Sequence, residues 1–238
     1  MTHPDPKYQP GDAPVPENAP EGAIISADTR RENRVPPGQT RTRKWPVLHY
    51  GRVPHTTTDQ WSLKVTGLVE NPLTLDWNAW KSLPRVRVFA DFHCVTRWSR
   101  LGNVWEGVSA REIMKRAGVK ENARYVIAGG YDDGWTTNMP LADFDDDDVL
   151  LADLHDGEPL NDDHGGPVRL IVPKLYAWKS AKWVCSLEFS AEDKPGLWER
   201  AGYHNHGDPW VQNDQNPDGE RFQSVQPDSY TSDDPGFF

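Results

Sequence analysis

The chain has 238 residues, enough for one large domain or two small ones, and its eleven tryptophans supply large apolar surface for a core. Its net charge of -10 argues against non-specific binding to nucleic acid or acidic membrane surfaces, because both would repel it. Two cysteines are too few for a disulfide framework, and no apolar stretch approaches the length of a membrane span. Since the N-terminus does not read as a secretory signal, we expect a cytoplasmic protein with both thiols reduced.

The chain divides by composition into three parts. Residues 1–43 are rich in Pro, Gly, Asp, Glu and Arg and show no hydrophobic periodicity, which predicts a flexible or surface-wrapping arm that adds little to a core. Residues 44–210 are expected to form the folded domain, with ordered structure beginning near Trp45. Residues 211–238 return to Asp, Pro, Gln, Ser and Gly, which predicts a loosely packed C-terminal tail.

Within the folded part, strand signals outnumber helix signals. Strands are predicted at 61–66, 85–94, 124–128, 149–152, 168–172 and 182–189. Asp76 is the expected N-cap of a short helix, Ser109 and Glu112 form a capping box for a second one that ends at Gly118, and a further helical turn is expected after Pro140. Because strands and helices do not alternate strictly, the predicted class is α+β, a mixed β-sheet with flanking short helices, and not a doubly wound fold.

Cys94 lies where the 85–94 strand meets the polar loop 95–99. Apolar residues alternate with other residues along this strand, and Cys94 continues the apolar face. A thiol held by a rigid element, with His93 and Arg97 nearby to favour the thiolate, is a candidate metal ligand or nucleophile. The alternative is an inert packing residue, since free cysteine is among the most buried residue types.

A second group of polar residues lies between Asp163 and Lys182. Two glycines at 165 and 166 let the backbone approach a ligand closely, while His164, Arg169, Ser180 and Lys182 offer donors suited to a phosphate or a polar heterocycle. Equally, Arg169 could be a solvated strand residue, the glycines a turn, and Lys182 an edge-strand charge. Composition alone leaves the two interpretations open.

Several blocks in register resemble sulfite-oxidase-type molybdopterin enzymes, in particular bacterial proteins that consist of the molybdopterin-binding domain. The blocks are Phe-His-Cys-Val-Thr-Arg-Trp-Ser at 92–99, Trp-Glu-Gly-Val at 105–108, the segment 135–141 with its Met-Pro-Leu, Asp-His-Gly-Gly-Pro-Val-Arg-Leu at 163–170, and Tyr-Ala-Trp-Lys-Ser-Ala-Lys-Trp at 176–183. The resemblance extends over roughly 45–210, so it implies that residues 44–210 are a molybdopterin-binding catalytic domain of that fold.

The resemblance also implies a cofactor and its ligands. The cofactor would be molybdenum held by one pyranopterin dithiolene and by the Cys94 thiolate, a soft ligand suited to such metals. Residues that match the pterin and phosphate contacts of the family are His164, Arg169, Ser180, Ala181 and Lys182, with an approximate match at Asp132 and a weaker one at His49.

Two departures from true sulfite oxidases concern the substrate. Those enzymes follow their cysteine with Ala-Gly-Asn and two arginines, whereas this chain continues Val95-Thr96-Arg97-Trp98-Ser99, and Trp135 stands where a tyrosine is usual. Fewer arginines and a bulkier, less polar wall predict poor sulfite turnover, with Arg97 as the candidate contact for an anionic or polar substrate group and with Trp98 and Trp135 shaping the pocket. Because few residues follow the resemblance, we also expect the dimerisation domain that follows the molybdenum domain in those enzymes, and its dimer interface, to be absent.

The implied activity is two-electron oxygen-atom transfer on a small substrate, sulfur compounds being one class. The sequence has no Cys-x-x-Cys-His haem motif and no set of cysteines for an iron-sulfur cluster. With no haem, flavin or iron-sulfur centre expected in this chain, electrons must pass through a separate electron-transfer partner. The alternative hypothesis is a non-catalytic pterin- or anion-binding module of the same fold, for which a thiolate at the metal position would be unnecessary.

Overall fold

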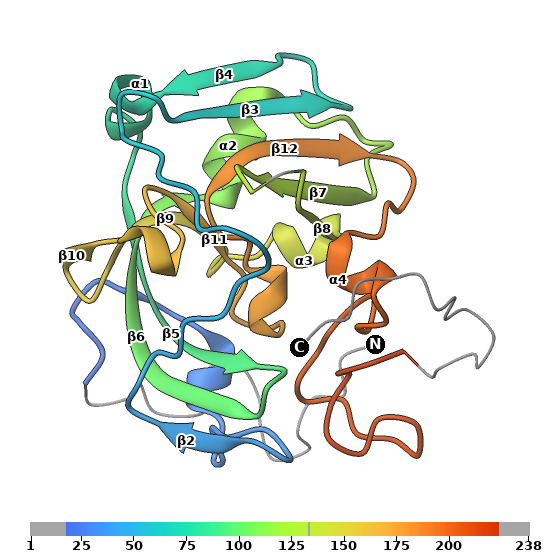
Figure 1. Ribbon diagram of the computed structural model, residues 1–238. Coiled ribbons are helices and arrows are strands. Elements are labelled where there is room, and N and C mark those ends of the chain that lie inside the picture. The colour runs from blue at the N-terminus through green and yellow to red at the C-terminus, as the bar shows by residue number, and fades with distance from the viewer. Residues whose placement is uncertain (1–17, 133, 224–238) are drawn as a thin grey trace.

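The computed structural model describes residues 18–132 and 134–223 of the chain. Figure 1 shows two β-sheets, one in the upper part of the view and one at the lower left, with short helices at their edges. Both sheets contain parallel and antiparallel pairs. The predicted α+β class with mixed pairing and short helices is therefore confirmed, although the strands divide between two sheets where the sequence suggested one.

The five-stranded sheet has the order β4-β3-β12-β7-β8. Its strands are β3 (Ser62–Gly67), β4 (Leu73–Asp76), β7 (Tyr125–Gly130), β8 (Thr136–Pro140) and β12 (Val184–Ser190). Strand β3 shows why the alternating pattern selects a strand, since Leu63 and Val65 are fully buried whereas Lys64 and Thr66 are exposed. Strands β3 and β12 run parallel, although 116 residues separate the end of one from the start of the other.

The seven-stranded sheet has the order β1-β5-β6-β9-β10, with β2 paired to β6 and β11 paired to β9. Its strands are β1 (Ile24–Ile25), β2 (Thr40–Thr42), β5 (Val86–Cys94), β6 (Trp98–Ser109), β9 (Leu150–His155), β10 (Glu158–Pro159) and β11 (Arg169–Ile171). A register shift between Ala90 and Phe92 interrupts the β5–β6 ladder just before Cys94. Such bulges bend a strand and re-aim the side chains that follow, which matters for the site below.

One apolar cluster joins the two sheets. It contains Leu63 and Leu187 from the five-stranded sheet and Val108 and Leu151 from the seven-stranded sheet, all fully buried. A smaller cluster around Val88 and Trp105 covers the other part of the seven-stranded sheet. The sheets are therefore packed against each other and form one rigid support for the loops at their edges.

Helix α2 (Ala110–Ala117) forms as the capping box predicts. The Ser109 hydroxyl accepts a hydrogen bond from the backbone N–H of Glu112 at 3.2 Å, and Gly118 adopts a left-handed conformation (φ 62°) that ends the helix. Ile113 on its inner face is fully buried. The other helices are single turns or little more: η1 (Ala27–Arg30), α1 (Trp77–Lys81), α3 (Leu141–Phe144), η2 (Asp162–His164), η3 (Ala177–Lys179) and α4 (Leu197–Arg200).

The described part of the N-terminal segment contributes more structure than the sequence suggested. Strand β1 pairs in parallel with β5, and Ile24 packs against the Val88 cluster. Arg34 forms a two-pronged ion pair with the buried Asp91, at 2.6 and 2.8 Å. In the described part of this segment the hydrophobic contact with the core is made by the partly buried Ile24, and Arg34 supplies the cation that the buried Asp91 carboxylate needs.

The C-terminal residues 211–223 also contact the body of the protein. Val211 is buried, and the Arg221 guanidinium donates two hydrogen bonds to the carbonyl oxygen of Val95, at 2.6 and 3.0 Å. Residues 1–17 and 224–238, which belong to the predicted arm and tail, lie outside the described residues. Among the helices described, none has the length and apolar character needed to cross a bilayer.

Candidate functional site

Cys94 ends β5 and begins a tight turn into β6. The Arg97 N–H donates to the Cys94 carbonyl at 3.0 Å, and Arg97 itself adopts a left-handed backbone (φ 71°), which closes the turn. The side chain of Cys94 points into a pocket, and the residue is 8% exposed. Thr96 folds back over the thiol, so that its hydroxyl donates a hydrogen bond to Sγ at 3.2 Å. The hairpin thus presents one buried thiol with a built-in hydrogen-bond donor.

The electrostatics at this thiol are set by burial and by Thr96. Burial raises the pKa of Cys94, whereas the hydrogen bond from Thr96 and the nearby Arg221 guanidinium act in the opposite direction. A metal ion would displace the thiol proton outright, since its charge exceeds that of any protein group nearby. Cys94 is therefore well placed as a metal ligand but is not an activated free thiolate.

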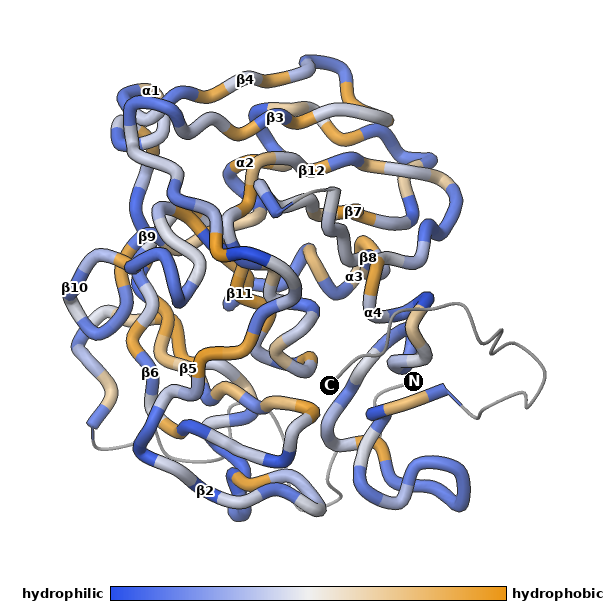
Figure 2. Tube along the Cα trace, in the orientation of Figure 1, coloured by the Kyte–Doolittle hydropathy of each residue, from blue (hydrophilic) through white to orange (hydrophobic). Residues whose placement is uncertain are grey.

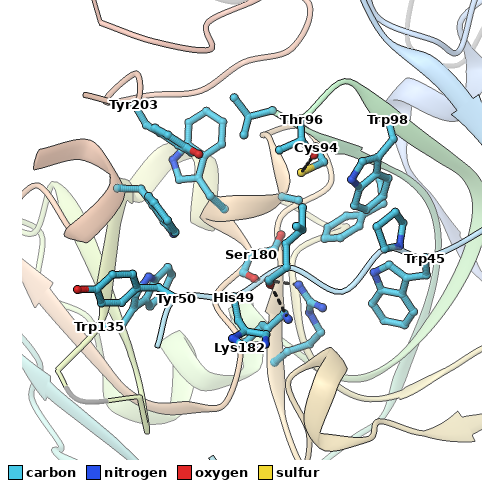
Figure 3. Close-up of a pocket in the computed structure, with 18 of the residues that line it drawn as sticks. Trp45, His49, Tyr50, Cys94, Thr96, Trp98, Trp135, Ser180, Lys182 and Tyr203 are labelled. Carbon is cyan, nitrogen blue, oxygen red and sulfur yellow. Dashed lines mark hydrogen bonds between the residues drawn. The ribbon is translucent and has the colours of Figure 1, made fainter. Parts of the chain in front are cut away.

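The pocket is lined by strands, short helices and loops that lie far apart in the sequence (Figure 3). In the view, Trp45 and Trp98 lie on one side, and Tyr50, Trp135 and Tyr203 lie on the other. Cys94 stands at the top of this space, and Lys182 lies below it. Besides the labelled residues, the lining includes Pro46, Leu48, Phe92, Val95, Asp132, Arg169, Ala177, Trp178, Trp183 and Trp198.

The floor of the pocket is cationic. The Arg169 guanidinium, 2% exposed, donates to the carbonyl oxygens of His164 (2.8 Å) and Ser180 (3.0 Å). Burial lowers the pKa of Arg169 to about 9, and burial together with Arg169 lowers the pKa of Lys182 to about 7. Lys182 Nζ donates to the backbone carbonyl oxygens of Leu48 and Asp163, at 2.8 and 2.6 Å.

This floor has unused capacity for an anion. Within residues 18–132 and 134–223, no carboxylate forms an ion pair with Arg169, and its buried Nε has no hydrogen-bond partner. The buried Nδ1 of His164 is likewise unpartnered, while the ring stacks on Trp45 with centroids 3.7 Å apart. A buried cation without a counter-charge is costly, so the arrangement fits an anionic ligand such as a phosphate.

The opposite wall is aromatic. Trp135, Trp178, Trp198 and Tyr203 form this aromatic wall, and Tyr203 stacks on Trp198 with centroids 5.0 Å apart. The wall has a polar support behind it: Trp178 Nε1 donates to the Glu199 carboxylate at 3.0 Å. The same oxygen lies 2.6 Å from Lys179 Nζ.

Lys179 and Glu199 are fully buried at their side chains. A buried pair of this kind fixes geometry, because breaking either half would leave an uncompensated charge. Because the indole N–H of Trp178 donates to the Glu199 carboxylate, the pair holds this ring in one orientation at the edge of the pocket.

Most of the residues that the sequence nominated lie at this pocket. Its lining includes Cys94 and Trp135 as well as His49, Asp132, Arg169, Ser180 and Lys182. Ser180 has a structural partner, since its hydroxyl accepts a hydrogen bond from Val172 N–H at 2.9 Å. The other three nominated residues lie outside the lining and have separate environments.

His164 lies just behind the floor, between Trp45 and the Arg169 guanidinium. Ala181 is buried beneath it, and its carbonyl oxygen accepts a hydrogen bond from Leu170 N–H. Arg97 points away: its side chain is half exposed and forms an ion pair with Asp218 at 3.0 Å. The left-handed backbone at Arg97 turns it out of the pocket, so we do not carry it forward as a substrate contact.

Sequence reasoning missed several residues that line the pocket. Thr96 was detectable in principle, because a hydroxyl two positions after a turn cysteine can reach back to the sulfur. Trp178, Trp198 and Tyr203 were not assigned, since nothing in their spacing indicates that η3, α4 and the loop after it meet at Cys94. Trp45 was recognised as the start of order but not as the ring that covers His164.

Comparisons with known proteins agree with this geometry. A family model described as "Oxidoreductase molybdopterin binding domain" matches residues 50–198. The "Uncharacterized oxidoreductase YuiH" of Bacillus subtilis is 51% identical over 181 residues, which cover 76% of this chain and 91% of that protein. The "Inducible nitrate reductase [NADH] 1" of Glycine max is 31% identical over 173 residues, which are 58% of this chain but 19% of that protein.

Among solved structures, the sulfane dehydrogenase SoxCD of Paracoccus pantotrophus superposes with a TM-score of 0.58 at 24% sequence identity. The match covers 65% of this chain and 43% of that one. At this identity the likeness concerns the fold alone. The chain thus corresponds to nearly the whole of the Bacillus relative and to about a fifth of the plant nitrate reductase.

Proposed function

Because the chain belongs to the oxidoreductase molybdopterin-binding domain family, we propose that it is a molybdenum-dependent oxidoreductase whose metal is ligated by Cys94. Its cofactor is molybdenum carried by molybdopterin. The proposed reaction is two-electron oxygen-atom transfer to or from a small substrate, sulfur compounds being one class. One observation carries the proposal: the thiol of Cys94 lines the same pocket as Arg169, a buried guanidinium that has no ion-pair partner among the described residues.

The residues present fit this cofactor. Molybdopterin bears a phosphate, and the floor carries Lys182 and the buried Nε of Arg169, a donor without a hydrogen-bond partner, while Nδ1 of His164 just behind the floor is also unpartnered. Gly165 gives this floor its close backbone approach, because a Cβ there would lie 2.8 Å from Cβ of Lys182. Arg169, His164, Lys182 and the 180–182 backbone would hold the pterin and its phosphate, with Asp132 and His49 at the edges.

When bound, the cofactor supplies the two-electron redox change that lets oxygen pass between substrate and water. The chain's own residues then have three tasks. Cys94 would hold the metal at the end of a rigid hairpin, with the Thr96 hydroxyl oriented on its sulfur. The aromatic wall excludes bulk water and orients the substrate by contact, and the buried Glu199 holds Trp178 in that wall.

The scarcity of cationic side chains near the aromatic wall supports the expectation of weak sulfite turnover. Arg97 is engaged with Asp218 at the surface, and Arg221 donates to the Val95 carbonyl behind the turn. The described lining on the aromatic side bears no charged side chain. An oxyanion would therefore lose hydration there without a cation to replace it.

The test is metal analysis of protein made in a host that synthesises the cofactor. We expect roughly stoichiometric molybdenum in the wild type and its loss in Cys94→Ser. Cys185→Ser is the matched control, because the second thiol lies in β12 and is absent from the pocket lining. X-ray absorption at the molybdenum edge should show one sulfur ligand fewer in any metal that the Cys94 variant retains.

Wild-type protein that is metal-free from a competent host would contradict the proposal and favour the non-catalytic binding module. If both cysteine variants kept their molybdenum and its sulfur ligands, Cys94 would not be the ligand. For wild-type protein that does contain molybdenum, a screen of sulfite and sulfoxides with artificial electron donors and acceptors would identify the direction of the reaction.

A further inference from the structure

The segment that covers the pocket has a charge unlike the rest of the molecule. The chain has a net charge of -10, yet residues 33–58 contain five Lys or Arg and no Asp or Glu. The part of this segment from 41 to 52, called the strap here, leaves β2 and crosses the front of the molecule toward β3 (Figure 1). An acidic protein therefore carries a local basic surface at the entrance to its pocket.

The cations of the strap are available to a partner. Arg41, Arg43, Lys44 and Arg52 are exposed, and within the described residues none of the four forms an ion pair. Many other cations among the described residues are neutralised by ion pairs, as the Arg111 pair with Asp145 illustrates. Unneutralised charge on one face attracts and orients an oppositely charged protein.

The strap also has an apolar centre. Val47, Leu48 and Tyr50 are 42%, 49% and 44% exposed, and only Phe222 joins them among the large hydrophobic residues exposed in the described chain. Figure 2 shows an orange, hydrophobic stretch on the trace between β2 and β3, with hydrophilic blue segments of the same connection on either side of it. Apolar side chains surrounded by a basic rim have the composition of a protein-docking site.

The same segment reaches the pocket from its inner side. Leu48 and Tyr50 line the cavity as well as the surface, and the Leu48 carbonyl oxygen accepts a hydrogen bond from Lys182. A protein bound to the strap would therefore be separated from the pocket by one layer of residues. This position suits a partner that exchanges electrons with a centre in the pocket.

We propose that the strap is the docking surface for a small acidic one-electron carrier protein of the flavodoxin or ferredoxin type. The inference rests on the proposed function, which requires two electrons and two protons for each oxygen atom removed from substrate as water. Two reduced carriers would each supply one electron, with the protons drawn from solvent. In the opposite direction, two oxidised carriers would accept the electrons released when water provides the oxygen.

A small acidic protein fits the strap better than an anionic membrane does. The basic surface is local, and the remainder of the molecule is strongly acidic. An extended anionic bilayer would meet that acidic remainder within a few Debye lengths of about 10 Å, whereas a small carrier covers the strap alone. Contacts with a limited apolar centre and a charged rim are also typical of transient electron-transfer complexes.

The test compares two double variants with the same charge change. Arg43→Glu/Lys44→Glu alters the strap without touching a pocket-lining residue, and Lys64→Glu/Lys115→Glu alters exposed cations on β3 and α2. Flavodoxin is the probe. Its affinity for the holoenzyme is measured by calorimetry, and its rate of electron transfer to the holoenzyme is measured by stopped-flow absorbance. Reduced methyl viologen, a small cationic donor, is the reference reductant.

We expect the strap variant to weaken flavodoxin binding and slow electron transfer by about tenfold or more, and the control variant to change either by less than about twofold. The wild-type rate should fall steeply with ionic strength, and viologen should reduce all three proteins alike. Equal effects of the two variants, or a salt-independent rate, would overturn docking at the strap. Failure of viologen reduction would instead refute the proposed function, and calorimetry would still decide whether the strap binds the acidic protein.

Other occupants of the strap give distinct results. Binding to phosphatidylserine vesicles that only the strap variant loses, with flavodoxin unaffected, would identify a membrane surface and overturn the proposal. Tighter binding of the basic cytochrome c than of flavodoxin would also overturn it. So would a wild-type dimer that the strap variant converts to a monomer, since the occupant would then be a second copy of the chain.

Discussion

Replacing Arg169 with Gln separates the structural role of this side chain from its proposed ligand role. Burial lowers the pKa of Arg169 to about 9, and at about 1.4 kcal/mol per pH unit the charged form is destabilised by roughly 5 kcal/mol in the cofactor-free protein. Removing the charge relieves this penalty. The carbonyl oxygens of His164 and Ser180 then lose charged donors, a loss of about 1.5–3 kcal/mol each.

These contributions nearly cancel, so the free energy of unfolding of the cofactor-free protein should change by no more than about 2 kcal/mol. Cofactor retention should change far more. A charge-assisted contact to a buried phosphate contributes roughly 3–5 kcal/mol when only one partner is removed, which corresponds to a loss of affinity of about 100-fold or more. Denaturant melts of the cofactor-free protein and molybdenum content of the loaded protein measure the two quantities separately.

Arg34→Gln is the matched control, because Arg34 is a partly buried arginine that, unlike Arg169, pairs with a carboxylate, the fully buried Asp91. Its removal leaves a buried carboxylate unpaired and should destabilise the protein by about 3–5 kcal/mol, with little effect on molybdenum per folded molecule. The reasoning would be refuted if Arg169→Gln unfolded the cofactor-free protein as severely as Arg34→Gln does while the molybdenum content stayed at the wild-type level.

Three further predictions concern other groups. Thr96→Val removes the hydrogen bond of about 1 kcal/mol to the Cys94 sulfur and should lower the two-electron midpoint potential of molybdenum by roughly 20 mV in a redox titration, whereas Thr96→Ser should restore it. Burial alone would lower the pKa of His206, but hydrogen bonds with Asp143 and Glu220 raise it to about 9. Its stabilisation, about 2 kcal/mol after allowance for solvent screening, is therefore complete below pH 6.5 and lost as pH rises through 9, and His206→Gln should flatten that part of a pH series of melts. Burial raises the pKa of Asp148 to about 6, so the carboxylate is destabilising above that pH. Asp148→Asn should raise the unfolding free energy at pH 8 by up to about 3 kcal/mol and have no effect near pH 3, and a pH-independent change would contradict this account.

Local patterns predicted the elements that depend on neighbours in the chain. The capping box at Ser109 and the left-handed glycine at 118 act over a few residues, so helix α2 was accessible from the sequence. The N-terminal strand β1 was not, because two residues without periodicity become a strand only when β5 supplies their hydrogen-bond partners. The same reason explains the division of the strands into two sheets.

In the site, side-chain chemistry was predictable and side-chain direction was not. Cys94, Arg169 and Lys182 were chosen because their chemistry suits a metal and an anion, and the structure brings all three to one pocket. Arg97 was chosen on the same grounds, but a positive φ turns it toward Asp218. The turn geometry and the ion pair with Asp218 therefore place an arginine three residues from the thiol outside the pocket lining.

The sequence by itself determined the inventory: a thiol at a strand end, basic residues beside glycines, many tryptophans, and the helix signals that act within a few residues. The tertiary structure alone decided that the aromatic wall, built from residues 135 to 203, closes over Cys94, and that the basic strap lies across the entrance. The physical reason is the separation along the sequence of the residues that interact. Capping and periodicity are interactions between residues close in sequence, whereas a pocket forms where segments far apart in sequence bury surface against one another, and no local pattern encodes which segments will meet.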